Sequence, residues 1–279
     1  MYSAQITRQH KAAFVILLDR SGSMAEEVTF EGRRTTKAEA LAEAVNTLIE
    51  EIICRSHRER YVGNYFDIAI IGYSGERAEN LLGKGFRSIV DVNSMNVPIF
   101  YKPICRTLPS GERLHSVVER HRWIEPKAEG LTPMGDALRM ARRMVRSWCK
   151  KHPDSFPPIV INITDGEATD SSHEEICALA ESIRACATND GGSLLMNIHI
   201  AEGDHTTAPS LTFPCEGDRL PTNRHSQLLY DISSTLPEFY NTMLSGNNST
   251  PHRAVCYNAS LSELVGLLAI GTLSMEQMI

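Results

Sequence analysis

The sequence contains no apolar run that approaches the ~20 residues needed to span a membrane, although hydrophobic residues fill 42% of its 279 positions. One short apolar run, residues 12–18, follows Arg8, His10 and Lys11 in the manner of a secretion signal. It ends in a charged pair and lacks a small-residue cleavage site, so it does not fit that class. We therefore expect a soluble, cytoplasmic protein with no membrane partner.

An excess of basic residues is also missing, because the formal net charge is −6. Nonspecific binding to nucleic acid needs a basic face, so we expect no nucleic-acid partner. The seven cysteines are odd in number, no pair has C-x-x-C spacing, and neither cysteines nor histidines form a zinc-like group. We expect reduced thiols, with Cys54, Cys149 and Cys177 buried in apolar helical patterns.

The common nucleotide and hydrolase signatures are absent. No G-x-x-x-x-G-K-[ST] loop is present, and no G-x-G-x-x-G follows the first apolar run, which excludes P-loop nucleotide triphosphatases and Rossmann dinucleotide enzymes. The segment Gly72-Tyr73-Ser74-Gly75 resembles a nucleophile elbow, but Glu76 occupies the last position of G-x-S-x-G. Ser74 is therefore interpreted as an ordinary residue at the end of a strand.

Apolar segments of two kinds alternate along the chain. Continuously apolar runs are typical of strands buried on both faces, and they occur at residues 12–18, 67–73, 159–163 and 194–201. Apolar residues at helical spacing predict helices at residues 37–58, 134–148 and 176–183. This alternation predicts an α/β fold, a doubly wound and mostly parallel sheet with helices on both faces.

The remaining segments have weaker patterns. Residues 91–130 and 202–224 are rich in proline or polar residues and are predicted to be irregular excursions, the first with a short helix at 114–119. We predict short strands at 85–90 and 228–232. We also predict helices at 237–244 and 261–268, separated by a flexible linker at 245–251.

Three polar loops follow strands or open a helix. Asp19, Ser21 and Ser23 come directly after the first strand, Thr132 lies just before the helix that starts near residue 134, and Asp165 follows the strand at 159–163. In open α/β sheets, ligands bind beyond the carboxyl ends of the strands. If the first strand and the strand at 159–163 are neighbours, the three loops converge there.

The side chains of these loops share one chemistry. Two carboxylates and three hydroxyls are hard oxygen donors, which suit Mg²⁺, Mn²⁺ or Ca²⁺ and not zinc or copper. Alternate residues of an extended loop face the same way, and Gly22 allows a sharp turn between the serines. Two negative charges do not exceed the charge of a divalent ion, so the site would stay electrophilic toward an acidic group.

Each loop also has a simpler interpretation. Asp19 and Ser21 can cap a turn, Thr132 can be the N-cap before Pro133, and Asp165 can stand in an ordinary turn. A hydroxyl oxygen has two lone pairs, so capping and metal binding are compatible. The polar residues after the third loop are interpreted as the solvated start of a helix, with a tuning role as the alternative: Glu167, Thr169 and Asp170.

In this order, the segments DRSGSM, GLTPMG and TDGE resemble the metal-ion-dependent adhesion site of von Willebrand factor A (vWA) domains. The segments ISSTLPEFY and SLSELVGLLAIGT resemble the last helices of bacterial, tellurite-resistance-type members. The resemblance covers about residues 11–273, and the excursions at 91–130 and 202–224 match poorly. It implies a single domain over residues 1–279, with a short antiparallel edge strand near 85–90.

The resemblance also implies the site and its use. Ser21, Ser23 and Thr132 would coordinate the ion directly, while Asp19 and Asp165 would act mainly through water. A glutamate or aspartate of a protein partner would complete the coordination. The implied function is recognition and not catalysis, as a scaffold or adaptor in a bacterial stress-response or defence system.

Two alternatives remain open. A Mg²⁺-dependent phosphoryl-transfer hydrolase of the haloacid dehalogenase kind also places an aspartate after its first strand. It needs a second aspartate two residues later, where this chain has Ser21. The other alternative is a structural module in which the metal only ties the loops together.

Overall fold

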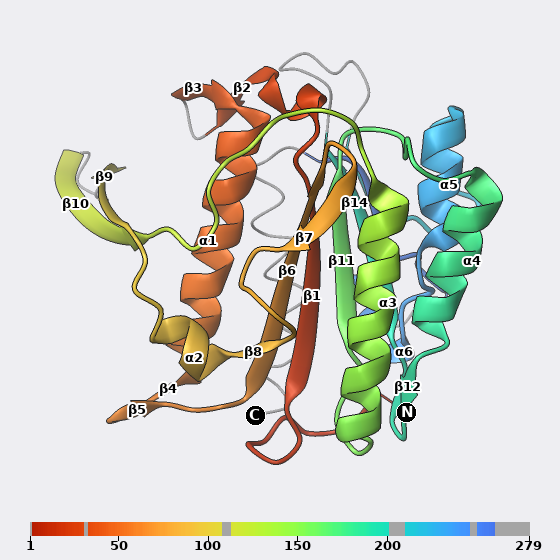
Figure 1. The fold of residues 1–279 in the computed structure, drawn as a ribbon, viewed down its shortest axis with the longest axis horizontal. Helices are drawn as coiled ribbons and strands as arrows, with labels where there is room; N and C mark the ends of the chain where they lie inside the picture. The colour runs from red at the N-terminus through yellow and green to blue at the C-terminus, as the bar shows by residue number, and fades with distance from the viewer. Residues whose placement is uncertain (1, 31–32, 108–112, 201–209, 246–249, 260–279) are drawn as a thin grey trace.

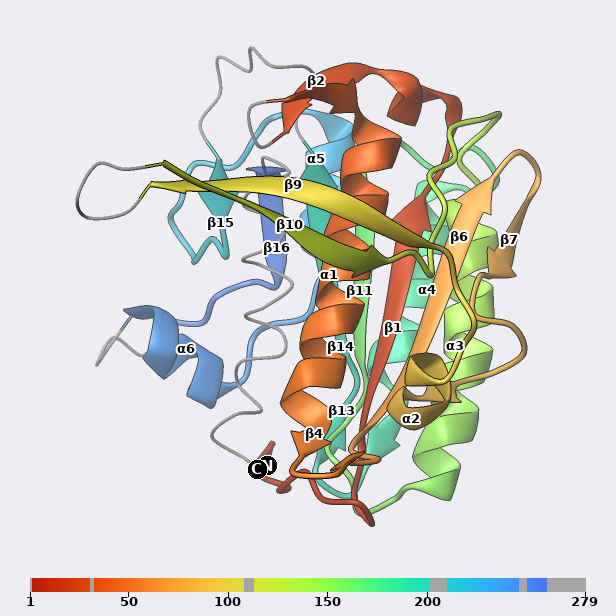
Figure 2. The ribbon, with the colours of Figure 1, turned by 90° about the vertical axis from the view of Figure 1, so that its left-hand side faces the viewer.

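Five parallel strands form the centre of a sheet that antiparallel strands extend on both sides (Figures 1 and 2). The computed structural model describes residues 2–30, 33–107, 113–200, 210–245 and 250–259. Within them the strand order is β15-β16-β14-β11-β1-β6-β7, and β8 also pairs with β6. The parallel strands are β1 (Ala12–Asp19), β6 (Phe66–Ser74), β11 (Ile159–Thr164), β14 (Leu194–Ile200) and β16 (Val255–Ala259).

Strand β1 lies between β6 and β11 and is buried on both faces, as its apolar run predicts. Side chains alternate across the sheet, so Phe14 and Ile16 face one core while Val15 and Leu17 face the other. Every residue of Ala12–Leu18 is at most 1% exposed. The strand that carries the first polar loop is therefore fixed by packing on two sides.

Helices cover both faces of the sheet (Figure 1). One face packs against α1 (Lys37–Ser56), α2 (Ile89–Asn93) and α6 (Glu238–Ser245), and the other against α3 (Met134–Lys151), α4 (His173–Arg184) and α5 (Arg224–Ile232). Capping boxes fix the first turns of α1 and α4, with Thr36 and Ser172 as the N-caps. This arrangement confirms the doubly wound, mostly parallel α/β fold.

The helix predicted at residues 114–119 is wrong. Residues 99–121 contain a hairpin of β9 (Ile99–Thr107) and β10 (Arg113–His121), which lies on the far side of α1 from the main sheet (Figure 1). Exposed and half-buried side chains alternate from Ser116 to Arg120, which is the two-residue period of a strand. Ion pairs from Lys102 to Glu43 and from Arg120 to Glu50 attach the hairpin to α1.

The strand predicted at residues 228–232 is also wrong, because these residues belong to helix α5. Leu228, Leu229 and Ile232 share one buried helix face, and the side chain of Asn223 caps the helix by accepting from the amide of Ser226 at 2.7 Å. The last parallel strand is instead β16, which the sequence analysis missed. The excursion at 202–224 contributes one short edge strand, β15 (Leu211–Thr212), antiparallel to β16.

The remaining short elements lie near these layers. Strand β8 (Arg87–Ser88) runs antiparallel to β6, in part as expected for residues 85–90, and β7 (Arg77–Asn80) forms the edge. Three small hairpins join other elements: β2 (Glu27–Phe30) with β3 (Arg33–Thr36), β4 (His57–Arg58) with β5 (Tyr61–Val62), and β12 (Ala187–Thr188) with β13 (Gly191–Gly192). The helix predicted at 261–268 lies outside the described residues.

Two expectations from composition can be compared with the structure. The six cysteines whose side chains are described carry no disulfide; Cys149 is buried as predicted, whereas Cys54 is exposed and Cys177 half-buried. Burial raises the pKa of the Cys149 thiol to about 11. Among the described helices, none is both long enough and apolar enough to cross a membrane.

Candidate functional site

The carboxyl ends of β1 and β11 lie side by side, which is the condition for the polar loops to converge. Leu18 pairs with Ile163 in the parallel register. Asp19 is therefore the last residue of β1 next to Thr164, the last residue of β11, and Asp165 follows at once. The sheet brings the first and third loops together as the sequence predicts.

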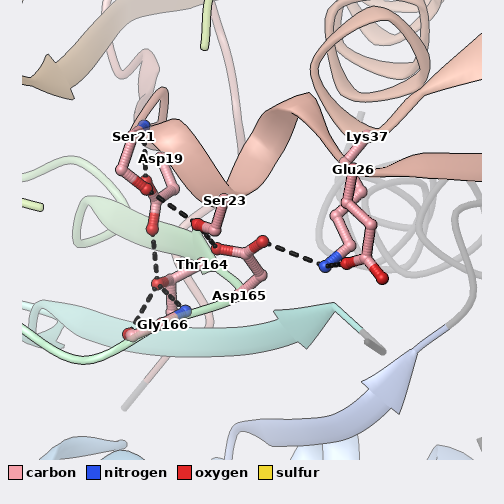
Figure 3. Close-up of polar contacts among 8 residues, drawn as sticks. All are labelled: Asp19, Ser21, Ser23, Glu26, Lys37, Thr164, Asp165 and Gly166. Carbon is pink, nitrogen blue, oxygen red and sulfur yellow. Dashed lines mark hydrogen bonds and ion pairs between the residues drawn. The ribbon is translucent and has the colours of Figure 1, made fainter. Parts of the chain in front are cut away.

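Four of the five predicted site residues form one hydrogen-bonded set (Figure 3). The hydroxyl oxygens of Ser21 and Ser23 lie 3.0 Å apart, and Ser23 Oγ donates to Asp165 Oδ1 at 2.7 Å. Asp19 accepts from the amide of Ser21 at 2.9 Å and from the hydroxyl of Thr164 at 2.7 Å. Hydroxyl and carboxylate oxygens from two strand ends thus face one small volume.

The backbone of the first loop differs from the expected extended loop. It is extended only as far as Ser21, and Gly22–Ala25 form a turn of 3-10 helix, η1. This tighter path still brings the oxygens of Ser21 and Ser23 together. Gly22 does not have a positive φ, so the sharp left-handed turn that glycine would permit is not used here; a Cβ at this position would lie 3.4 Å from the carbonyl oxygen of Gly130, an ordinary contact distance.

The second loop, which carries Thr132, is connected to both others through the backbone. The amide of Gly22 donates to the carbonyl of Gly130 at 3.0 Å. Thr132 and Thr169 are joined twice, because the amide of Thr132 donates to Thr169 Oγ1 and the amide of Thr169 donates to the carbonyl of Thr132, both at 3.0 Å. Thr132 is 7% exposed, so the loop places it in the interior of this end of the sheet.

Thr132 is not the N-cap of helix α3, because the N-cap position lies one residue later than predicted. Helix α3 begins at Met134 with Pro133 at the N-cap position, where no side chain caps it locally. Instead, the carboxylate of Asp170 accepts from the amides of Gly135 at 2.9 Å and Asp136 at 2.8 Å. Asp170 and Thr169 are thus not merely a solvated helix start, because they fasten the Thr132 loop to the loop after β11.

Sequence reasoning missed Lys37, whose ammonium reaches the site from the first residue of α1. Its Nζ lies 3.0 Å from Asp165 Oδ2 and 2.5 Å from Glu26 Oε2, and its side chain is only 1% exposed (Figure 3). A signal was present in the sequence. A positive charge in the first turn of a helix opposes the helix dipole, so a lysine directly after the N-cap Thr36 is unfavourable by itself, although this pattern does not identify its acidic partner.

Burial and charge pairing have opposite effects on the pKa values of the ionisable groups of the site. Burial raises the pKa of Asp19, against the hydrogen bonds from Ser21 and Thr164, and the nearby Asp165 raises it further. Burial lowers the pKa of Lys37, but its pairing with Glu26 and Asp165 outweighs this and raises the pKa. With three carboxylates and one ammonium ionised, the local charge is two negative units, which one divalent cation would neutralise.

A buried polar chain underlies the strand ends. The hydroxyl of Tyr73 donates to Asn162 Oδ1 at 3.0 Å, Asn162 donates to Asn197 Oδ1 at 3.0 Å, and Asn197 donates to Ser233 Oγ at 2.9 Å. These residues cross from β6 through β11 and β14 to the end of α5. Because the side-chain amides of both asparagines are paired, this series of hydrogen bonds adds directional contacts to an otherwise apolar layer. It thereby fixes the strands that carry the loops.

The donor set fits a hard divalent cation. Asp19, Ser21, Ser23 and Asp165 offer only oxygen atoms, and the hydroxyl of Thr132 belongs to the same end of the sheet. Across the described residues, no group of three or more histidine, cysteine, aspartate and glutamate side chains is placed to hold a metal. The oxygen set does not depend on such a group, because hydroxyls supply three of its five members.

Comparison with known proteins bears on the fold. No family model matches the chain, and no curated protein matches its sequence. The vWF domain of the type V pili tip protein Mfa5 from Porphyromonas gingivalis is similar in structure, with a TM-score of 0.50 and 7% identity over 96% of both chains. The fold is von Willebrand factor A-like.

A second vWA neighbour is a von Willebrand factor type A protein from Catenulispora acidiphila. It aligns with 70% of this chain at 16% identity and a TM-score of 0.42, and the chain covers 34% of that protein's length. In this vWA-like fold, the loops that carry Asp19, Thr132 and Asp165 gather at the carboxyl ends of the parallel strands. At such low identities the likeness extends to the fold alone.

Proposed function

We propose that this chain is a divalent-metal-dependent protein-recognition module. The supporting observation is the continuous set of oxygens from Asp19 through Ser21 and Ser23 to Asp165 at the ends of two adjacent strands. In the proposal these residues and Thr132 hold Mg²⁺, or Mn²⁺ or Ca²⁺. The bound ion supplies an electrophilic centre for a carboxylate of a protein partner.

The chain's own residues have separate parts in this proposal. Ser21, Ser23 and Thr132 present neutral oxygens, and Asp19 and Asp165 supply charge, mainly through water. Lys37 holds one oxygen of Asp165 from the opposite side. Because no covalent step is involved, the proposed module is not an enzyme, and its finer role is that of a cytoplasmic scaffold or adaptor in bacterial stress response or defence.

Thermal unfolding with and without metal tests the first half of the proposal. Mg²⁺ or Mn²⁺ should raise the melting temperature of the EDTA-treated protein, since a ligand of the folded state stabilises by RT ln(1 + [L]/Kd). Replacing both Asp19 and Ser21 by alanine should remove this shift. The matched control is Glu76→Gln, which neutralises an exposed carboxylate in the turn after β6 and should leave the shift unchanged.

Affinity purification with and without EDTA tests the second half. A partner that is lost both in EDTA and in the Asp19 and Ser21 double variant supports recognition through the metal. Turnover of a generic phosphatase substrate with Mg²⁺, abolished by Asp19→Ala, would instead establish the phosphoryl-transfer alternative.

One observation favours a structural module as the second candidate. The ammonium of Lys37 already joins Glu26 to Asp165, so a cation belonging to the chain ties the η1 turn to the loop after β11. Under this alternative, metal stabilises the fold while the set of bound partners is the same with and without EDTA.

A further inference from the structure

A cavity of about 190 Å³ opens beside the candidate metal site, where α4 and α5 begin. The two helices lie next to each other on the same face of the sheet (Figure 1). Polar groups line the cavity from both helices and from the loop after β11: Glu167, Ser171, His173, Arg224 and His225. A space of this size admits several water molecules or one acidic group with a few attached atoms.

His225 is the unexplained group of this cavity. It is only 8% exposed, yet neither of its ring nitrogens has a hydrogen-bond partner among the described residues. The ring of His199 lies 5.4 Å away, centre to centre, in a tilted ring contact that satisfies neither nitrogen. Both nitrogens are buried, and His225 lines the cavity. Because buried polar groups are nearly always paired, two unpaired nitrogens in a cavity-lining residue point to a ligand that pairs with them.

The charge state of His225 limits what that ligand can be. Burial lowers its pKa to about 4, helped by His199 and opposed by Asp165. The imidazole is therefore neutral near neutral pH and offers one N–H donor and one acceptor nitrogen. The cavity adjoins the candidate metal site, because Glu167 and Ala168 in its lining directly follow the loop that carries Asp165.

Two other polar groups of the cavity, Arg224 and Ser171, can donate hydrogen bonds to a ligand. Arg224, the first residue of α5, brings a guanidinium with five N–H groups. Ser171 Oγ accepts from Arg139 at 2.8 Å and keeps its own hydrogen as a donor. Glu167 is exposed, and Glu174 interacts with Arg224 through its charge. Arg224 and Ser171 therefore supply hydrogen-bond donors at the cavity, while these acids reduce its net positive charge.

We propose that this cavity binds an oxyanion, the carboxylate or phosphate group of a ligand, between Arg224, Ser171 and the N–H of His225. A guanidinium pairs with either group through two parallel bonds. The site is distinct from the set around Asp19 and needs no metal. It would place a second binding site for an acidic group next to the proposed metal site.

Histidine ring signals in two-dimensional ¹H–¹³C NMR test the proposal on the full chain. The protein is treated with EDTA and then dialysed into metal-free buffer at neutral pH and constant ionic strength, because EDTA is itself a carboxylate. The metal site then has no part in the result. Inorganic phosphate and acetate are the two probes, titrated separately. The His225 signal is assigned by its absence in His225→Phe, a variant that keeps the ring volume.

The expected result is a saturable shift of the His225 signal with one or both probes, with Kd of about 1–10 mM. Arg224→Gln should weaken it at least several-fold. Arg224 is exposed, so this variant should fold. Arg143→Gln, which removes an exposed arginine of α3, is the matched control and should bind like the parent.

The probe that saturates at lower concentration identifies the preferred group. A shift that stays linear with both probes, or that is the same in Arg224→Gln, would overturn the proposal and leave the cavity as a water-filled space. Because every measurement is made without metal, failure here is separate from failure of the metal-dependent function.

Discussion

Replacing Lys37 by methionine gives the most specific test of the electrostatics of the site. The change keeps the length and apolar stem of the side chain and removes only the ammonium. Lys37 and Asp165 have side chains that are each 1% exposed, so their ion pair is buried, whereas Glu26 is 43% exposed and can return to water. The variant therefore leaves one buried carboxylate without its cation.

The structure gives the size of the effect. Removing one partner of a buried ion pair typically costs ~3–5 kcal/mol. The serine hydrogen bond to Asp165 remains, so we expect the unfolding free energy in EDTA to fall by about 3 kcal/mol. Added Mg²⁺ should recover part of this loss, because it supplies positive charge to the same carboxylate.

Urea denaturation in EDTA and in millimolar Mg²⁺ provides the four free energies needed. The stabilisation by Mg²⁺ should be larger in Lys37→Met than in the parent by at least about 1.4 kcal/mol, which corresponds to tenfold tighter binding. Lys84→Met, at an exposed lysine, is the control and should change neither value by more than ~0.5 kcal/mol. Equal stabilisation by Mg²⁺ in parent and Lys37→Met would refute the shared-carboxylate reasoning.

Two further predictions concern stability. Gly130→Ala should destabilise the fold by about 2–4 kcal/mol in urea denaturation, because φ is +67° and the new Cβ would lie 2.7 Å from Gly75 Cα; Gly85→Ala, with φ +72° and no atom within 4 Å, should lose only ~1–2 kcal/mol. The depressed pKa of His225, about 4 against 6.5, means that the unfolded chain binds its proton first, so stability falls as pH drops between these values. This loss should reach about 2 kcal/mol by pH ~5 and be absent in His225→Phe, measured as the difference between the two pH profiles. A parallel fall in both proteins would contradict the assignment.

The central part of the fold could be predicted because its signals are local. The run from Ala12 to Leu18 is apolar at every position, is rich in β-branched and aromatic residues and ends at polar turn residues, which together favour a strand covered on both faces. The positions of Asp19 and Asp165 then follow from where the strands end. Whether those ends meet depends on strand order, which the sequence leaves open and the pairing of β1 with β11 decides.

The errors arose where tertiary contacts override short patterns. Residues 228–232 contain a short apolar run compatible with a strand or a helix, and the Asn223 cap and the facing helix α4 favour the helix. Strand β16 has only five residues and is held by pairing with β14. Lys37 and Asp170 act on atoms more than thirty residues away along the chain, so no local pattern assigns their partners.

The loops around the candidate site are joined to one another through main-chain atoms. The amide of Gly22 donates to the carbonyl of Gly130, and the amide of Glu129 donates to the carbonyl of Arg20. The amides of Thr132 and Thr169 each donate a hydrogen bond to the other residue. Exposed side chains of these loops, such as Leu131 at 58% exposure, take no part in these main-chain hydrogen bonds. Side chains of the rim can therefore be changed one by one while the oxygen set beneath them keeps its shape.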